Sequence, residues 1–307
     1  MTTALTSSRP PSDIGELGSQ RLRRLQPFTL RLVVWGHCVE IAGLHRDGVG
    51  DPLVFLHGFG STKEDYADVI HLPELATRPV LAYDAPACGA SRSSSLAVIS
   101  IPFLVAVAAE VLHARAIARC HLIGHSMGGL TALLLATQNP SSVASFINIE
   151  GNLASEDCFL SRGIINHPQD DPEQFLADFA ERVATSRYHG SALYAAALPH
   201  KVRAGAVGPI FESMVALSDG GGLLERFLNL SAPRMFMYGC QNDSLSYLSR
   251  LRANGIALAE IAHCAHFPMY SNPPEMWRHL SRFIASTGPT DPAHTEQNSM
   301  RVAAHAR

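Results

Sequence analysis

The chain has 307 residues, of which 47% are hydrophobic and 17% charged, and its formal net charge is −3. This composition is too apolar for a disordered protein, and the chain is long enough to bury a large core without disulfides or a structural metal. It has no basic block typical of a nucleic-acid partner and no apolar stretch long enough to cross a bilayer. We therefore expect a globular protein that binds neither nucleic acid nor membrane.

The two ends of the chain differ from its middle. Residues 1–27 and 287–307 are rich in polar residues and in helix and strand breakers, so we expect flexible N- and C-terminal segments. The first segment lacks the apolar stretch that a secretory signal needs. The six Cys are scattered without a C-x-x-C pair, which indicates neither a zinc site nor a redox motif. Free thiols suit a reducing compartment, so we expect a cytoplasmic protein.

Between the ends, short apolar runs alternate with helical patterns. Runs of this length, apolar on both faces, are typical of parallel strands covered by helices. The alternation predicts a doubly wound α/β sheet, whose ligand site lies beyond the carboxyl ends of its strands. The runs span residues 53–56, 80–83, 121–123, 146–149, 235–238 and 256–261, and the main helical patterns span 102–116, 127–138 and 274–286.

Residues 152–230 interrupt this alternation. They contain helical patterns, including two near 191–199 and 207–218, but no convincing strand. We interpret residues 152–230 as a helical lid inserted between two strands. Residues 28–151 and 231–286 would then form the core.

The strongest chemical signal is the segment Gly124-His125-Ser126-Met127-Gly128, which fits G-x-S-x-G. It lies between an apolar run and a helical pattern, where the glycines permit a turn too sharp for larger side chains. Such a turn holds a Ser hydroxyl above the sheet, at a helix N-terminus that favours developing negative charge. The pattern predicts Ser126 as a nucleophile.

A second glycine-rich segment, His57-Gly58-Phe59-Gly60, directly follows the first predicted strand. An acyl-transfer enzyme needs two backbone N–H donors aimed at the oxyanion. Met127, the residue after Ser126, would supply one of them. We expect Phe59 to supply the other, so that Phe59 and Met127 form the oxyanion hole.

Together with the loop Asp84–Ser91 and the segment His266-Phe267-Pro268, these motifs resemble the α/β-hydrolase superfamily in type and order. The resemblance covers about residues 30–286. It implies a mainly parallel eight-stranded sheet, a lid over the site, and a serine hydrolase mechanism with no metal and no organic cofactor. Ala87 and Ala265 depart from the pattern, because the family usually has Gly at both positions.

The catalytic base must be a His late in the chain. His263 and His266 both follow the last predicted strand, and the resemblance assigns the base to His266, whose loop matches the family's. His266 would accept the Ser126 proton and later return it to the leaving group.

The position of the acid is open between two carboxylates. The family usually places it after the seventh strand, in a Gly-x-x-Asp turn, but here the third residue after Gly239 is Asn242, and Asp243 comes one residue late. Some members, zearalenone-type lactone hydrolases among them, place the acid after the sixth strand. Glu150 ends an apolar run there, where an unpaired carboxylate would be costly. We favour Glu150, with Asp243 as the alternative.

These residues predict hydrolysis of an ester-type bond, in a carboxylic ester or a lactone, through an acyl-enzyme. A small, largely apolar substrate is expected from the apolar side chains of the lid. Hydrolysis of an amide, a carbamate or an activated C–C bond stays open, and so does a ligand-binding receptor on the same scaffold. The protein could also form a homo-oligomer. The lid side chains concerned are Phe175, Phe179, Tyr194, Phe211 and Met214.

Overall fold

A single sheet organises the computed structural model, which describes residues 24–165, 171–188 and 190–287. Its main path of eight strands runs β1-β2-β4-β3-β6-β7-β8-β9, and the short β5 pairs with β2. From β4 to β9 all neighbours are parallel, whereas β2 is antiparallel to both β1 and β4. This confirms the predicted mainly parallel sheet. The predicted flexible ends lie almost wholly outside the described residues.

The strands of the sheet centre are those that the apolar runs predict. Every residue of β3, β4, β6 and β7 is buried, as expected for strands covered by helices on both faces. The strands are β1 Gln26–Val34, β2 His37–Arg46, β3 Leu53–Leu56, β4 Val80–Tyr83, β5 Arg92–Ser93, β6 Cys120–His125, β7 Val143–Ile149, β8 Arg234–Gly239 and β9 Ala257–Ile261.

The hairpin of β1 and β2 does not follow from the apolar runs. Exposed and half-buried residues alternate along β1, because it is an edge strand with one face toward solvent. Trp35 and Gly36 connect the two strands with φ values of 51° and 79°. Two consecutive residues with positive φ are typical of a tight hairpin turn, which fixes the register of the pair.

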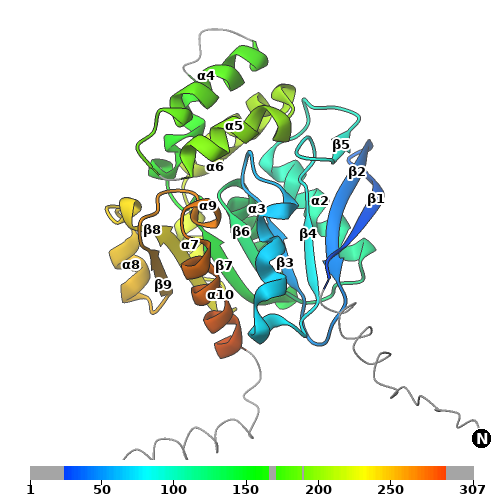
Figure 1. Cartoon of the computed structure of the whole chain (residues 1–307), viewed down its shortest axis with the longest axis vertical. Coiled ribbons are helices and arrows are strands. Elements are labelled where there is room, and N and C mark those ends of the chain that lie inside the picture. The colour runs from blue at the N-terminus through cyan, green and yellow to red at the C-terminus, as the bar shows by residue number, and fades with distance from the viewer. Residues whose placement is uncertain (1–23, 166–170, 189, 288–307) are drawn as a thin grey trace, which may run out of the picture.

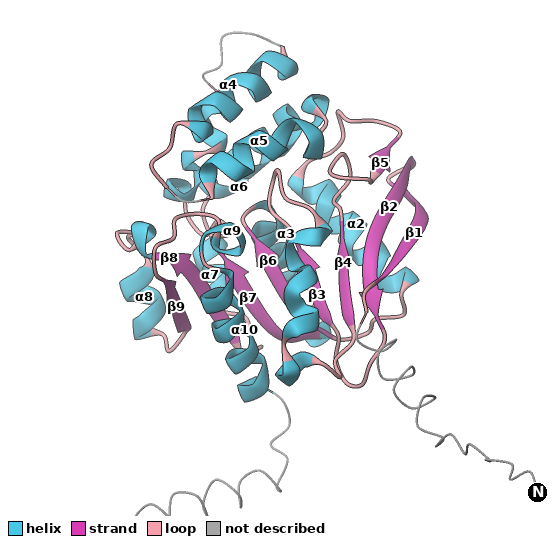
Figure 2. Ribbon diagram, viewed as in Figure 1, coloured by secondary structure: helices cyan, strands magenta, loops and turns pink. Residues whose placement is uncertain are grey.

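Helices cover both faces of the sheet, with α10 in front and α2 and α3 behind in the view of Figure 2. The buried side of α10 comes from residues at helical spacing, among them Met276, Leu280 and Ile284. Within the described residues, no helix combines the length and the apolar character needed to cross a bilayer. The α-helices are α2 Ile101–Ala114, α3 Met127–Gln138, α4 Pro172–Ala184, α5 Ser191–Lys201, α6 Val207–Asp219, α7 Leu223–Leu228, α8 Leu248–Ala253, α9 Pro268–Ser271 and α10 Pro273–Thr287.

Between β7 and β8 the chain leaves the sheet and forms the inserted helices, α4, α5 and α6 (Figure 1). They gather beyond the carboxyl ends of the parallel strands. The next helix, α7, returns to the sheet, where Phe227 packs against Phe146 of β7 and Phe236 of β8. The division of the chain into a core and a lid stays a prediction, but α7 within residues 152–230 packs with the sheet.

Candidate functional site

Ser126 lies in the turn between β6 and α3, with φ 50° and ψ −117°. Side chains larger than hydrogen cannot fit beside this turn. A Cβ on Gly124 would lie 2.5 Å from the backbone oxygen of Gly128, and a Cβ on Gly128 would lie 2.1 Å from that of Leu56. The G-x-S-x-G pattern is therefore a packing requirement here, and the strained Ser126 conformation is held by its surroundings.

His266 lies directly against Ser126. Its Nε2 is 2.9 Å from Ser126 Oγ, across 140 residues of sequence, and both side chains are buried. His125, the residue before the serine, helps to fix this arrangement, since its Nε2 hydrogen-bonds to the backbone oxygen of His266 at 2.8 Å. Burial lowers the pKa of His266 to about 4, which favours the neutral imidazole. His263, the other histidine of this loop, is exposed.

Glu150 follows the last residue of β7 and has a φ of 52°. Its Oε2 lies 3.4 Å from Nδ1 of His266, slightly beyond the usual hydrogen-bond range of about 2.7–3.2 Å. The carboxylate accepts two shorter bonds, from the backbone N–H of Gly239 and from Nδ2 of Asn242, both at 2.7 Å. Burial raises its pKa to about 8, although these two hydrogen bonds act in the opposite direction.

The two candidate acids are thus placed differently. Asp243 is exposed, and in the described part of the chain it makes no hydrogen bond or ion pair with His266. Asn242 occupies the expected acid position of the turn after β8, and its amide is bonded to Glu150. From the sequence, Asn242 is only the residue that stands where the family usually has its acid. Its role as a donor follows from the adjacency of β7 and β8, which the pattern of single residues does not reveal.

The loop that carries Phe59 passes close to the serine turn. A Cβ on Gly58 would lie 2.4 Å from Nδ1 of His125 and 3.1 Å from Cβ of Ser126. Phe59 and Met127 are both buried, and among the described residues neither backbone N–H donates a hydrogen bond. Two free N–H groups therefore lie on the segments that adjoin Ser126.

Tyr194 of α5 links the inserted helices to this loop. Its hydroxyl donates to the backbone oxygen of Phe59 at 2.9 Å, and its ring stacks on Phe267 with centroids 4.2 Å apart. Tyr194 is buried. Sequence reasoning treated it only as an apolar side chain of the lid. The contact spans 135 residues, and no local signal in the sequence predicts it.

A pocket adjoins Ser126 and His266. The inserted helices and the loops of the sheet both contribute to its wall. Phe175 does not line it, because this ring packs behind Phe179 and Phe211. The apolar part of the wall consists of Phe59, Leu160, Phe179, Phe211, Met214 and Phe267.

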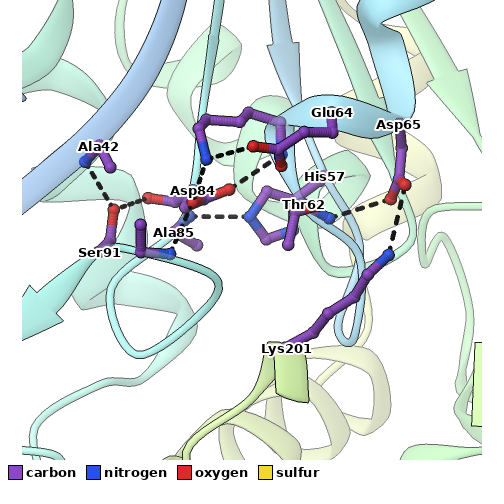
Figure 3. A network of polar contacts seen from close by, with 11 residues as sticks. Ala42, His57, Thr62, Glu64, Asp65, Asp84, Ala85, Ser91 and Lys201 are labelled. Atoms are coloured by element: carbon purple, nitrogen blue, oxygen red, sulfur yellow. Dashed lines mark hydrogen bonds and ion pairs between the residues drawn. The ribbon is translucent and has the colours of Figure 1, made fainter. Parts of the chain in front are cut away.

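A second buried carboxylate, Asp84, follows β4 (Figure 3). It accepts hydrogen bonds from the backbone N–H groups of Lys63 and Ala90, both at 2.9 Å, and pairs with Nζ of Lys63 at 2.8 Å. The nearby ring of His57 accepts a bond from the N–H of Ala85 at 2.8 Å. Asp84 and His57 therefore stabilise the loops around the site and do not point at Ser126. Within the described residues, no group of three or more His, Cys, Asp or Glu is arranged to hold a metal ion.

Comparison with known proteins gives the family. The profile of the alpha/beta hydrolase family matches residues 53–278, which is most of the chain. The chain belongs to this family. The resemblance inferred from the motifs is thereby confirmed, and so is the mainly parallel sheet that it implies.

Individual members of the alpha/beta hydrolase family match over shorter segments. The sn-1-specific diacylglycerol lipase of Xenopus tropicalis is 36% identical over 120 residues, which are 37% of each chain. The pimeloyl-(acyl-carrier protein) methyl ester esterase of Aeromonas hydrophila is 35% identical over 120 residues, 39% of this chain and 43% of the esterase. A putative carbamate hydrolase of Variovorax paradoxus is 30% identical over 123 residues, 39% of this chain and 46% of that protein. The chain thus matches these relatives over less than half of their length.

Solved structures of other hydrolases share the fold over nearly their whole length. The N-acyl homoserine lactonase AidH, complexed with N-butanoyl homoserine, superposes with a TM-score of 0.68 at 18% identity, covering 87% of this chain and 98% of the lactonase. A carboxylesterase of Nitrososphaera gargenis gives 0.66 at 16% identity, covering 84% and 98%. At such identities the likeness concerns the fold alone.

Proposed function

We propose that this protein hydrolyses an ester bond, in a carboxylic ester or a lactone, through an acyl-enzyme on Ser126. The observation that carries the proposal is the distance of 2.9 Å between Ser126 Oγ and His266 Nε2, in a buried site beside a cavity. A neutral imidazole at this distance accepts the hydroxyl proton as the oxygen attacks a carbonyl. The esterase and lipase names of the relatives support the same reaction.

The remaining residues take roles that their positions allow. Glu150 orients His266 and stabilises the imidazolium that forms during attack. The backbone N–H groups of Phe59 and Met127 stabilise the oxyanion. His266 then donates its proton to the leaving group and later activates the water that releases the acyl group. No step requires a metal or an organic cofactor.

The inserted helices act as the lid in this proposal. Their aromatic side chains supply much of the apolar wall of the cavity, which supports a small, largely apolar substrate. We also propose that the protein is cytoplasmic, and we propose no oligomeric state.

Hydrolysis of a carbamate is the second candidate, because a putative carbamate hydrolase is among the relatives. The same three side chains would serve, since only the group attached to the carbonyl changes. A panel of esters, lactones, amides and carbamates distinguishes the two candidates by relative kcat/KM.

The experiment that tests the nucleophile is covalent labelling with a fluorophosphonate probe, combined with turnover of a simple aryl ester. We expect the wild-type protein to label and Ser126→Ala not to label. The kcat of Ser126→Ala should fall by about 10⁶-fold, with the thermal unfolding midpoint preserved. Unlabelled wild-type protein that still binds ester ligands would instead indicate a receptor.

A further inference from the structure

The wall of the cavity is not uniformly apolar. Besides Ser126, His266 and Tyr194, whose hydroxyl is bonded to Phe59, polar side chains reach it from one short stretch after β7: Asn152, Asp157 and Ser161. The last two belong to short 3-10 helices, Ser155–Phe159 and Ser161–Ile164. Apolar side chains make up most of the remaining wall. The cavity thus has a polar corner, defined as Asn152, Asp157 and Ser161.

Ser161 contributes a hydroxyl that has no partner. The residue is 2% exposed, and its Oγ makes no hydrogen bond in the described structure. A buried hydroxyl without a partner is unfavourable, and such groups persist where a ligand or a water supplies the missing bond. Since Ser161 lines the cavity next to Ser126, a bound substrate can supply it.

Asp157 is fixed in the corner by three donors. Its Oδ2 accepts from the backbone N–H groups of Leu153 and Ala154 at 2.7 and 2.8 Å, and its Oδ1 accepts from the hydroxyl of Tyr247 at 2.8 Å. No Lys or Arg among the described residues pairs with it. Burial raises its pKa to about 6, as expected for a carboxylate without a cation.

Asn152 adds a second hydrogen-bond acceptor to the polar corner. Its Nδ2 donates to Ser218 Oγ at 3.1 Å and to Cys158 Sγ at 3.3 Å. What the amide still offers is its carbonyl oxygen. The corner therefore presents acceptors from Asn152 and Asp157 and one hydroxyl, from Ser161, that can donate or accept.

We propose that the polar corner is a subsite that selects substrates carrying an uncharged hydrogen-bond donor, a hydroxyl or an amide N–H, next to an otherwise apolar ester. A hydroxyl fits both groups at once, because it can donate to the Asp157 carboxylate and accept from Ser161. A substrate carboxylate is disfavoured, since it would be buried beside the carboxylate of Asp157. The proposal rests on the ester hydrolysis proposed above and names the substrate class of that site.

The test compares two matched pairs of esters with wild-type protein and Ser161→Ala. One pair, the phenyl esters of butanoic and 3-hydroxybutanoic acid, differs by a hydroxyl on the acyl side. The other, butyl and 3-hydroxybutyl acetate, differs on the alcohol side. Ser155→Ala is the control, because Ser155 is exposed on the same stretch.

We expect wild-type kcat/KM to favour the hydroxylated member of at least one pair by about tenfold, the effect of one hydrogen bond. Ser161→Ala should lower that ratio severalfold, because the bond to Ser161 is lost while the bond to Asp157 remains, and Ser155→Ala should keep it. Ratios near one in both pairs for the wild type, or an unchanged ratio in Ser161→Ala, overturn the subsite. A phenyl 3-aminobutanoate preferred over the 3-hydroxy ester would also overturn it, in favour of a cationic donor.

The proposed ester hydrolysis is tested separately, by the rate at which the wild-type protein hydrolyses the unsubstituted esters. If no ester is turned over, that function fails, and the subsite is then measured by the affinity of Ser126→Ala for the same pairs by calorimetry. Tighter binding of the hydroxylated member, weakened on combining Ser126→Ala with Ser161→Ala, supports the subsite. Equal binding of both members contradicts it.

Discussion

Two buried carboxylates follow parallel strands of the same sheet, Asp84 after β4 and Glu150 after β7, yet their surroundings differ. Asp84 is fully buried and pairs with Lys63, so a permanent cation compensates its charge. Glu150 has no Lys or Arg partner among the described residues, only two neutral donors and the ring of His266. A carboxylate of the first kind stabilises the fold at all times. One of the second kind gains a cation only when the imidazole is protonated.

The largest expected effect comes from Glu150→Gln. The amide cannot stabilise an imidazolium, so kcat should fall by about 10⁴-fold, the scale for removing an orienting carboxylate. The free energy of unfolding should stay the same or increase, because folding of the wild type must either bury a charge or retain a proton on Glu150, and glutamine requires neither. Steady-state kinetics and urea denaturation measure the two quantities. A loss of stability with kcat preserved would show that Glu150 stabilises the fold, as Asp84 does, and takes no part in catalysis.

Asp84→Asn should show the reverse of Glu150→Gln, a loss of stability with little loss of kcat. Lys63 loses its buried partner, and breaking such a pair costs about 3 kcal/mol in the free energy of unfolding. Glu64, 2.6 Å from the Lys63 ammonium, retains part of the compensation. We expect kcat to change by less than about tenfold at temperatures where the variant is folded. Asp68→Asn, at an exposed position of the 3-10 helix Lys63–His71 that carries Lys63, is the matched control in urea denaturation.

The pH dependence of kcat should follow the pair of His266 and Glu150. The reactive form has a neutral imidazole beside an ionised carboxylate. Burial lowers the pKa of His266 to about 4 and raises that of Glu150 to about 8, so this form is complete only when the pair loses its last proton. We expect kcat to rise through one apparent ionisation at or above neutral pH. A rate independent of pH between about 5 and 9 would show that the pair has already lost its last proton below pH 5, which would contradict the raised pKa of Glu150.

Glu150→Gln sharpens this profile in two ways. Its residual activity should rise at lower pH than that of the wild type, since only His266 still titrates. The stability of the two proteins should also diverge with pH. Between about 4.5 and 8 the folded wild type retains a proton on Glu150 that the unfolded chain has lost. Its free energy of unfolding therefore falls as pH rises through this range, and this component is absent from the variant.

The smallest effect is expected for Asp243→Asn. Asp243 is exposed and does not contact His266, so kcat should change by less than about twofold and the unfolding midpoint should not move. This variant is also the matched control for Glu150→Gln, because both remove one carboxylate at the carboxyl edge of the sheet. A loss of kcat by several orders of magnitude in Asp243→Asn alone would return the acid to the turn after β8.

The sequence predicts the features that depend on local pattern. The buried strands, the Ser126 turn and the helical segments all follow from apolar runs, glycines and helical spacing. The hairpin of β1 and β2 escapes this approach because half of its residues face solvent. The choice between Glu150 and Asp243 depends on which side chain the adjacent strands β7 and β8 direct at His266. Long-range contacts of Tyr194 and the unpaired hydroxyl of Ser161 leave no trace in the spacing of residues.

The hydrogen bond from Tyr194 to Phe59 has a consequence for engineering by segment exchange. Grafting the inserted helices of a relative that lacks a tyrosine at this position would release the peptide plane between Phe59 and Gly60, and with it the conformation of the loop that carries the Phe59 N–H. Such a chimaera would lose turnover even where its new cavity wall suits the substrate. Phe59 and Tyr194 therefore have to be kept together. A library that recombines the inserted helices should retain a tyrosine at position 194 of α5.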